Sequence, residues 1–254
     1  MKKCLDFIEI FRIIRKLLRI IRILRTIKSD TMDKSRLIQE QKALAQKLIL
    51  TDAIEESAII AGASSVYTHD TIISVIIVYD IKENKVIEKK FTVEKEAMPF
   101  HKDFICYREC SSLIKTFHAL KNKPSLVFIE GVGILHPQKM GIASYFGLFA
   151  DIPTIGVSST KNFGMQEGDA VYYNKEILAK ILITKENARP IYVSQGHKIS
   201  LSTAIEKTKS FLLGHKLPEP VYLAHKYAAK IKGGLRKDNN MDEHNFFHQL
   251  SKLI

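Results

Sequence analysis

The order of the strand-like segments constrains the fold of this chain more than any other feature. Three segments in succession are β-rich or alternate polar with apolar residues, at 57–67, 70–80 and 85–94. From residue 104 onward, helical and strand patterns alternate instead. Three consecutive strands followed by such an alternation predict an α/β fold in which helices flank one mixed β-sheet.

The remaining elements follow from hydrophobic periodicity. In the first helical segment, for example, Leu37, Leu44 and Leu48 fall on one face. The other predicted elements are short strands at Leu126–Ile129, 153–157, 169–183 and 190–193, and helices at 33–50, 104–121, 139–150, 200–213 and 219–232. We therefore expect a domain over residues 32–232, preceded by an extension (1–31) and followed by a tail (233–254) that opens with a polar linker.

Composition narrows the class of protein. With 254 residues, 46% hydrophobic and 26% charged, the chain can form one α/β domain with a sizeable core. The net charge of +12 favours an anionic partner, either nucleic acid or an anionic membrane surface. The three cysteines show neither metal spacing nor a paired framework, which fits a reducing, cytoplasmic location. No apolar stretch is long enough to span a bilayer.

Much of the positive charge lies in residues 1–28, which hold nine Lys or Arg and two acids. The arginines recur every three or four positions between Arg12 and Arg22, so a basic amphipathic helix is predicted. Three interpretations stay open. The helix could dock on a membrane surface or partner protein, it could add a phosphate-binding stripe, or it could be upstream sequence preceding an alternative start at Met32.

A single carboxylate at a strand end marks the first candidate site. The apolar run 126–129 stops on Glu130, which is followed by a Gly-rich turn and His136. Open α/β sheets bind their ligands at the carboxyl ends of strands, and one or two carboxylates together with a substrate phosphate are enough to hold Mg²⁺. Glycines let a phosphate or base approach the backbone, and a histidine can protonate a leaving oxygen.

The segment around Glu130 resembles the central block of the endonuclease V family, and further blocks keep that family's order. Together they cover about residues 33–232. The matching segments are LHPQKMGIASYFGL (135–148) with IPTIGV (152–157), IYVSQGHKISL (191–201), LPEP (217–220) with LAH (223–225), YRE (107–109), and IAG (60–62) with Tyr67.

This resemblance implies a ribonuclease-H-like fold and a Mg²⁺-dependent nuclease, with Mn²⁺ as a possible substitute. Such enzymes recognise inosine, a deaminated purine, in DNA or RNA and cleave the phosphodiester one bond beyond it on the 3′ side. The damaged base is taken out of its stack while a wedge loop fills the gap. We expect a monomer with an inosine-containing nucleic acid as its partner.

Carried over residue by residue, the resemblance assigns catalytic roles to Glu109, Glu130, His136 and His197, with Glu109 and Glu130 as metal ligands. The family's first-strand aspartate, its central metal ligand, falls on Ser64. A serine hydroxyl is neutral and a poor ligand for Mg²⁺. The second-strand aspartate falls on Glu130, which is one methylene longer, and Mg²⁺ demands near-ideal octahedral geometry.

The residues expected to bind nucleic acid depend less on a metal. The family's catalytic lysine falls on Ser159, and Lys161 is a possible substitute two residues further on. In the wedge loop Phe100 can stack in place of the usual tyrosine. The residues predicted to contact nucleic acid are Phe100, Gly131, Gly133, Lys139, Lys161 and Lys198.

Two functions from different classes therefore remain. The first is a divergent endonuclease in which Glu109 and Glu130 hold Mg²⁺. The second is a protein that binds inosine or single-stranded nucleic acid and no longer cuts, which the replacements at Ser64 and Ser159 favour. An assay for cleavage of an inosine-containing oligonucleotide separates the two.

Overall fold

A computed structural model describes the chain except for residues 1–32, 56, 69–70, 97, 162 and 238–254. Its centre is a nine-stranded sheet in the order β3-β2-β1-β4-β5-β9-β8-β7-β6. The strands are β1 (Ile59–Thr68), β2 (Thr71–Asp80), β3 (Lys85–Lys95), β4 (Val127–Glu130), β5 (Thr154–Ser158), β6 (Met165–Glu167), β7 (Ala170–Tyr173), β8 (Glu176–Leu182) and β9 (Ile191–His197). The predicted extension 1–31 lies outside the described residues.

The sheet is mixed, as predicted. Strands β1, β2 and β3 form an antiparallel meander, whereas β4 and β5 continue the sheet in parallel with β1. Strand β9 then runs antiparallel to β5 and begins a second antiparallel portion. Because β1, β4 and β5 are parallel neighbours, their carboxyl ends meet at one edge of the sheet.

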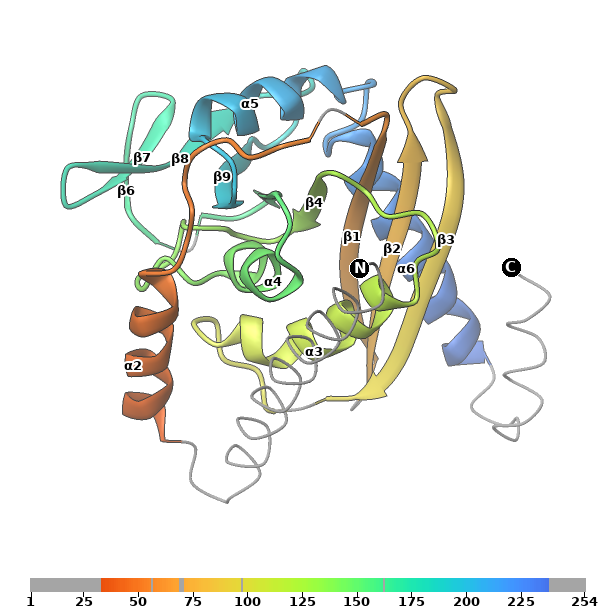
Figure 1. The fold of residues 1–254 in the computed structure, drawn as a ribbon, viewed down its shortest axis with the longest axis horizontal. Coiled ribbons are helices and arrows are strands. Elements are labelled where there is room, and N and C mark those ends of the chain that lie inside the picture. Colours follow the sequence, from red (N-terminus) through yellow and green to blue (C-terminus); the bar gives the residue numbers. More distant parts are fainter. Residues whose placement is uncertain (1–32, 56, 69–70, 97, 162, 238–254) are drawn as a thin grey trace, which may run out of the picture.

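Helices cover both faces, as Figure 1 shows for α3 and α4 on one side and α6 on the other. They are α2 (Lys34–Ala45), α3 (Ile105–His118), α4 (Ile142–Ala150), α5 (Leu201–Ser210) and α6 (Glu219–Lys237). Alternation along β1 explains the two layers. Ala61 and Ala63 pack in the core beneath α3 and α4, whereas Ile60 faces the core beneath α5 and α6.

Helix α6 lies directly on the backbone of β1. A Cβ at Gly62 would be 2.0 Å from the carbonyl oxygen of Pro220, in the first turn of α6. The absence of a side chain therefore allows the helix backbone to approach the sheet closely at this point. One face of α6 buries Val221, Ala224 and Ala228 against the strands.

The end of α6 and the presence of β6 differ from the sequence-based prediction. The polar linker predicted from residue 233 is wrong at its start, since α6 continues through Gly233 and Gly234 to Lys237. Leu235 still packs on the core beneath α6, and such burial outweighs the low helix propensity of two glycines. The rest of the predicted tail lies outside the described residues. Strand β6 was missed because its three residues are all exposed and carry no apolar pattern.

None of the helices in the described part of the chain combines the length and hydropathy required to cross a bilayer.

Candidate active site at the ends of β1 and β4

Ser64 and Glu130 lie side by side at the shared edge of two parallel strands. The β1–β4 ladder pairs Ala63 with Ile129, and the next residue on each strand is Ser64 or Glu130. The hydroxyl of Ser64 donates to Oε2 of Glu130 over 2.5 Å. The resemblance assigned these two residues to metal-ligand positions, and the structure places them next to each other.

Glu109 approaches the same edge from α3. Its side chain is buried, and Oε1 accepts a hydrogen bond from the hydroxyl of Tyr67 on β1. Burial raises the pKa of the Glu109 carboxyl to about 7, and the negative charge of Glu130 adds to the rise, against the lowering effect of the Tyr67 hydrogen bond. A carboxyl whose pKa is displaced in this way beside a second carboxylate is typical of a functional site.

His225 on α6 completes this group, and sequence reasoning assigned it no role beyond its place in the LAH segment. Its Nδ1 lies 2.9 Å from Oε2 of Glu130. The hydrogen bond to Glu130 raises the pKa of His225 against a smaller opposing effect of partial burial. The usable signal in the sequence was the LAH segment itself. In the structure His225 directly follows Ala224, which is buried against the sheet, so it stands at the margin of the docked helix face.

A cavity of about 180 Å³ opens beside the two carboxylates. The loop between β4 and α4 and the end of β5 form much of its wall. Among its lining residues are Glu109, Glu130, Gly131, His136, Ser158 and Thr160. The cavity is thus bounded by both acidic groups, on a scale suited to a small planar group and not to a folded polymer.

His136 lines this cavity, yet the protein engages both of its ring nitrogens. Nδ1 accepts from the backbone N–H of Gln138 at 3.2 Å, so Nε2 carries the hydrogen and donates to the carbonyl of Asp103 at 3.0 Å. Burial lowers the pKa of His136, which keeps the ring neutral. In this arrangement His136 ties the loop after β4 to the loop before α3; its predicted role as a proton donor stays a prediction.

The predicted wedge residue, Phe100, is held beside the site by Arg108. The guanidinium carbon of Arg108 lies 4.1 Å from the ring centroid of Tyr67 and 5.6 Å from that of Phe100. Arg108 also forms an ion pair with Glu96. Since the Phe100 residue is 67% exposed, its ring is available for stacking against a base.

His197 lies away from this group, and its position does not support the catalytic role predicted for it. On β9 it pairs with Thr154, three residues before the Val157 that pairs with Glu130. This places it about 10 Å back along the strands. His197 is buried, and its Nδ1 accepts from the backbone N–H of Ile49. The motif lies on the expected strand, but the register of β9 directs this residue into the core.

Lys198 lies at the same remote end, where its Nζ is 3.1 Å from a carboxylate oxygen of Asp151. Lys139 is nearer the cavity but forms an ion pair with Glu176 on β8, with a shortest distance of 2.5 Å. Lys161 is exposed after β5 and donates to the carbonyl of Gly164. Of these three lysines, Lys161 has no acidic partner among the described residues, and its predicted contact with nucleic acid stays a prediction.

The glycines at 131 and 133 have a structural explanation. A Cβ at Gly131, whose φ is +143°, would lie 2.4 Å from the side chain of Ile142. One at Gly133 would lie 2.1 Å from the carbonyl of Gln195. Close packing of the loop against α4 and β9 therefore accounts for both residues. Gly131 also lines the cavity, and its predicted contact with nucleic acid stays a prediction.

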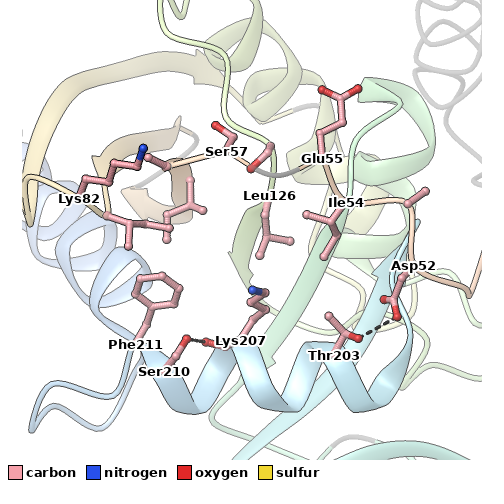
Figure 2. A pocket seen from close by; sticks show the side chains of 15 residues that line it. Asp52, Ile54, Glu55, Ser57, Lys82, Leu126, Thr203, Lys207, Ser210 and Phe211 are labelled. Atoms are coloured by element: carbon pink, nitrogen blue, oxygen red, sulfur yellow. Dashed lines mark hydrogen bonds between the residues drawn. The ribbon is translucent and has the colours of Figure 1, made fainter.

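A larger cavity, of about 750 Å³, lies at the opposite edge of the sheet (Figure 2). Ile60 of β1 and Leu126, just before β4, form part of its wall together with α5. Its hydroxyl groups are committed within the protein: Thr203 donates to Asp52, and Ser210 donates to the carbonyl of Lys207. Asp52, Glu55, Lys82 and Lys207 also line this cavity, whereas Glu109 and Glu130 do not.

The carboxylate oxygen atoms at the small cavity are ligands of the kind that Mg²⁺ prefers. Glu109 and Glu130 supply hard oxygen atoms, and their mutual repulsion is what a cation would relieve. In the described ranges, however, no three His, Cys, Asp or Glu residues gather closely enough to form a preformed metal centre. The residues therefore fit a cation held by two carboxylates, and Ser64 stands where a third would be.

The mixed sheet is flanked by helices, with Glu130 at the end of a central parallel strand and Glu109 beside it on α3, an arrangement of the ribonuclease-H-like class. Within that class, the sequence model for endonuclease V matches residues 42–226. Endonuclease V of Dictyoglomus thermophilum is 35% identical over 211 residues, covering 78% of this chain and 92% of the relative. That of Thermosipho melanesiensis is 32% identical, covering 78% and 90%. The chain belongs to the endonuclease V family.

Solved structures agree on the fold. Endonuclease V of Bacillus subtilis superposes with a TM-score of 0.76 at 24% identity, covering 83% of this chain and 96% of the other. Ciona intestinalis endonuclease V, in complex with a 24mer DNA containing an inosine followed by a ribo-adenosine, gives a TM-score of 0.72 at 23% identity. That comparison covers 79% of this chain and 98% of the other. The predicted ribonuclease-H-like fold is thus confirmed.

Proposed function

We propose that this chain is an endonuclease that recognises inosine in nucleic acid and cleaves more slowly than relatives carrying the full set of acidic residues. The observation that carries the proposal is the convergence of Glu109 and Glu130 on one small cavity, with His225 bound to Glu130. The inosine-containing DNA in the Ciona intestinalis complex supports the choice of substrate.

Glu109 and Glu130 are the residues that would hold Mg²⁺, or Mn²⁺ in its place. A bound divalent cation supplies activation of the attacking water and offsets charge on the departing oxygen. The chain itself contributes orientation. Tyr67 holds the Glu109 carboxylate, Ser64 and His225 hold that of Glu130, and Phe100 offers a ring to the stack next to the flipped base.

The slower rate follows from Ser64. A neutral hydroxyl replaces a charged ligand, so the cation is bound more weakly and the water is activated less. This same observation supports a second candidate function, binding of inosine-containing nucleic acid without cleavage. Ser159, exposed after β5 in place of the family's lysine, favours that second candidate as well.

The test uses labelled DNA and RNA oligonucleotides containing one inosine, incubated with the full chain and Mg²⁺ or Mn²⁺. We expect a product cut one bond beyond the inosine on its 3′ side, absent from the same oligonucleotide with adenine. Glu109→Ala serves as the inactive control. Product no greater than that control rejects the enzyme, and retained inosine-dependent binding in a mobility-shift assay would then establish the second candidate.

A further inference from the structure

Three side chains from three different elements meet at one oxygen atom. Oε2 of Glu130 on β4 accepts a hydrogen bond from Ser64 on β1 at 2.5 Å and lies 2.9 Å from Nδ1 of His225 on α6. The other carboxylate oxygen, Oε1, accepts no hydrogen bond from the residues that the structure describes. One side of the carboxylate is thus bound by the protein and the other is left available.

From this geometry we propose that Ser64 is a positioning residue: with His225, it fixes the Glu130 carboxylate so that Oε1 is presented to a divalent cation. The inference rests on the proposed function, because it places the cation at the same site. It assigns Ser64 an active part, in addition to its place at the position of a lost ligand.

The lengths of the two side chains support this role. Ser64 and Glu130 occupy equivalent ends of neighbouring parallel strands, about 4.8 Å apart across the sheet. The Ser64 side chain is short, and the longer Glu130 side chain reaches across to meet it. One carboxylate therefore stands between two strand ends, where the family pattern has an acidic residue on each strand.

The nature of the contact also matters. A serine hydroxyl donates to a carboxylate, whereas an aspartate at the same place would set one acceptor against another. Two carboxylates at such a distance repel and cannot both ionise readily without a cation between them. Serine at position 64 and glutamate at position 130 are thus a matched pair, and changing only one of them breaks the match.

The competing explanation is that Ser64 only fills space, since it is 1% exposed. Replacement by alanine separates the two because it preserves most of the packing and removes the donor. Groups that orient a metal ligand typically change metal affinity by roughly 10- to 100-fold when removed. Space filling alone predicts a change in stability with no change in affinity.

The experiment measures Mn²⁺ binding to the full chain by calorimetry, without nucleic acid. We expect Ser64→Ala to weaken Mn²⁺ binding by about 10-fold or more, and Ser64→Thr, which keeps the hydroxyl, to restore most of it. Ser125→Ala is the matched control, because it removes a hydroxyl from the opposite edge of the sheet, where Ser125 donates to the carbonyl of Ile59. Should Ser64→Ala fail to fold, Ser64→Cys, a weak donor of similar size, takes its place.

A second pair of variants tests the match itself. Ser64→Asp alone should lower the melting temperature of the metal-free protein and make it rise more steeply with added Mn²⁺. Adding Glu130→Asp should recover part of the loss, since the shorter side chain moves the two carboxylates apart. A double variant no more stable than Ser64→Asp alone would count against the matched pair.

Two results overturn the proposal: wild-type protein that binds no Mn²⁺ at millimolar concentration, or Ser64→Ala that binds it as tightly as wild type. These outcomes are distinct from failure of the proposed function. Mn²⁺ binding that depends on Ser64, without cleavage of inosine-containing strands, supports the positioning role and rejects the nuclease. Cleavage that is insensitive to Ser64→Ala supports the nuclease and rejects the positioning role.

Discussion

Acidic side chains at the two edges of the sheet have pKa values shifted in opposite directions. At the edge that holds Ser64 and Glu130, acidic groups crowd together, and burial raises the pKa of Glu109 to about 7. At the other edge, beside the larger cavity, Asp52 accepts hydrogen bonds from Ser200 and Thr203. There a rise caused by burial is outweighed by these hydrogen bonds, and the pKa of Asp52 is lowered.

Cavity volume therefore does not locate function in this protein. In the 750 Å³ cavity the carboxylate of Asp52 is bound by hydroxyl groups, and the cavity is lined by lysines as well as by acids. The 180 Å³ cavity has two carboxylates that repel each other, and a bound cation would relieve this repulsion. The repulsion between two neighbouring carboxylates, and not the volume of the cavity, distinguishes the candidate site.

The largest expected effect is on the cleavage rate. It is tested by neutralising one acid at each edge of the sheet and comparing the two rates. Glu130→Gln should raise the barrier to cleavage by about 4 kcal/mol, or roughly 1000-fold in rate, because it removes a charged cation ligand. Asp52→Asn should leave the rate within about twofold. Single-turnover rates on an inosine oligonucleotide measure both, and equal losses would abolish the distinction between the edges.

The second effect concerns stability. Glu109 has a folded-state pKa of about 7 against an unfolded value of 4.5, so its cost to stability is absent below pH 4.5, grows between pH 4.5 and 7, and is complete above pH 7. Glu109→Gln should therefore stabilise the metal-free protein at alkaline pH, by up to about 3 kcal/mol, and leave it unchanged at the acidic end of that window. Denaturant unfolding on both sides of the window tests this, with exposed Glu167→Gln as the control.

The third effect contrasts two histidines. His225→Ala should reduce Mn²⁺ affinity and cleavage roughly 10- to 100-fold, because it removes a group that orients Glu130. His197→Ala should instead cost about 1–3 kcal/mol of unfolding free energy, since the N–H of Ile49 loses its acceptor. Cleavage by the folded fraction of His197→Ala should be unchanged; a loss of rate there, at full folding, would restore a catalytic role to His197.

The smallest effect is on binding. Phe100→Ala should weaken affinity for an inosine-containing strand about 10-fold by removing one stacking contact, with little effect on Mn²⁺ binding. Met165 is 70% exposed and lies on β6, away from the carboxylates, so Met165→Ala is a suitable control. Fluorescence anisotropy in the presence of Ca²⁺ measures both affinities, and equal values would remove Phe100 from the interface.

The order of strands and helices was sufficient to predict the mixed sheet, because that order follows from local patterns. The family resemblance was sufficient to place Ser64 and Glu130 at one site. It was insufficient for His225 and His197. Whether a histidine on a helix or strand reaches a site depends on how that element docks, and this is decided by contacts distant in sequence. Both ring nitrogens of His136 are similarly committed by the fold, to Asp103 and Gln138.

One of those docking contacts has a wider consequence. Because the backbone of α6 rests on Gly62, a hydrogen atom in place of a side chain sets the height of His225 above the strand ends. Even a methyl group at position 62 would push α6 away from the sheet. The imidazole of His225 would then move away from Oε2 of Glu130, although no charged residue had been changed. Loss of metal affinity in this protein can thus originate at a position with no chemistry of its own.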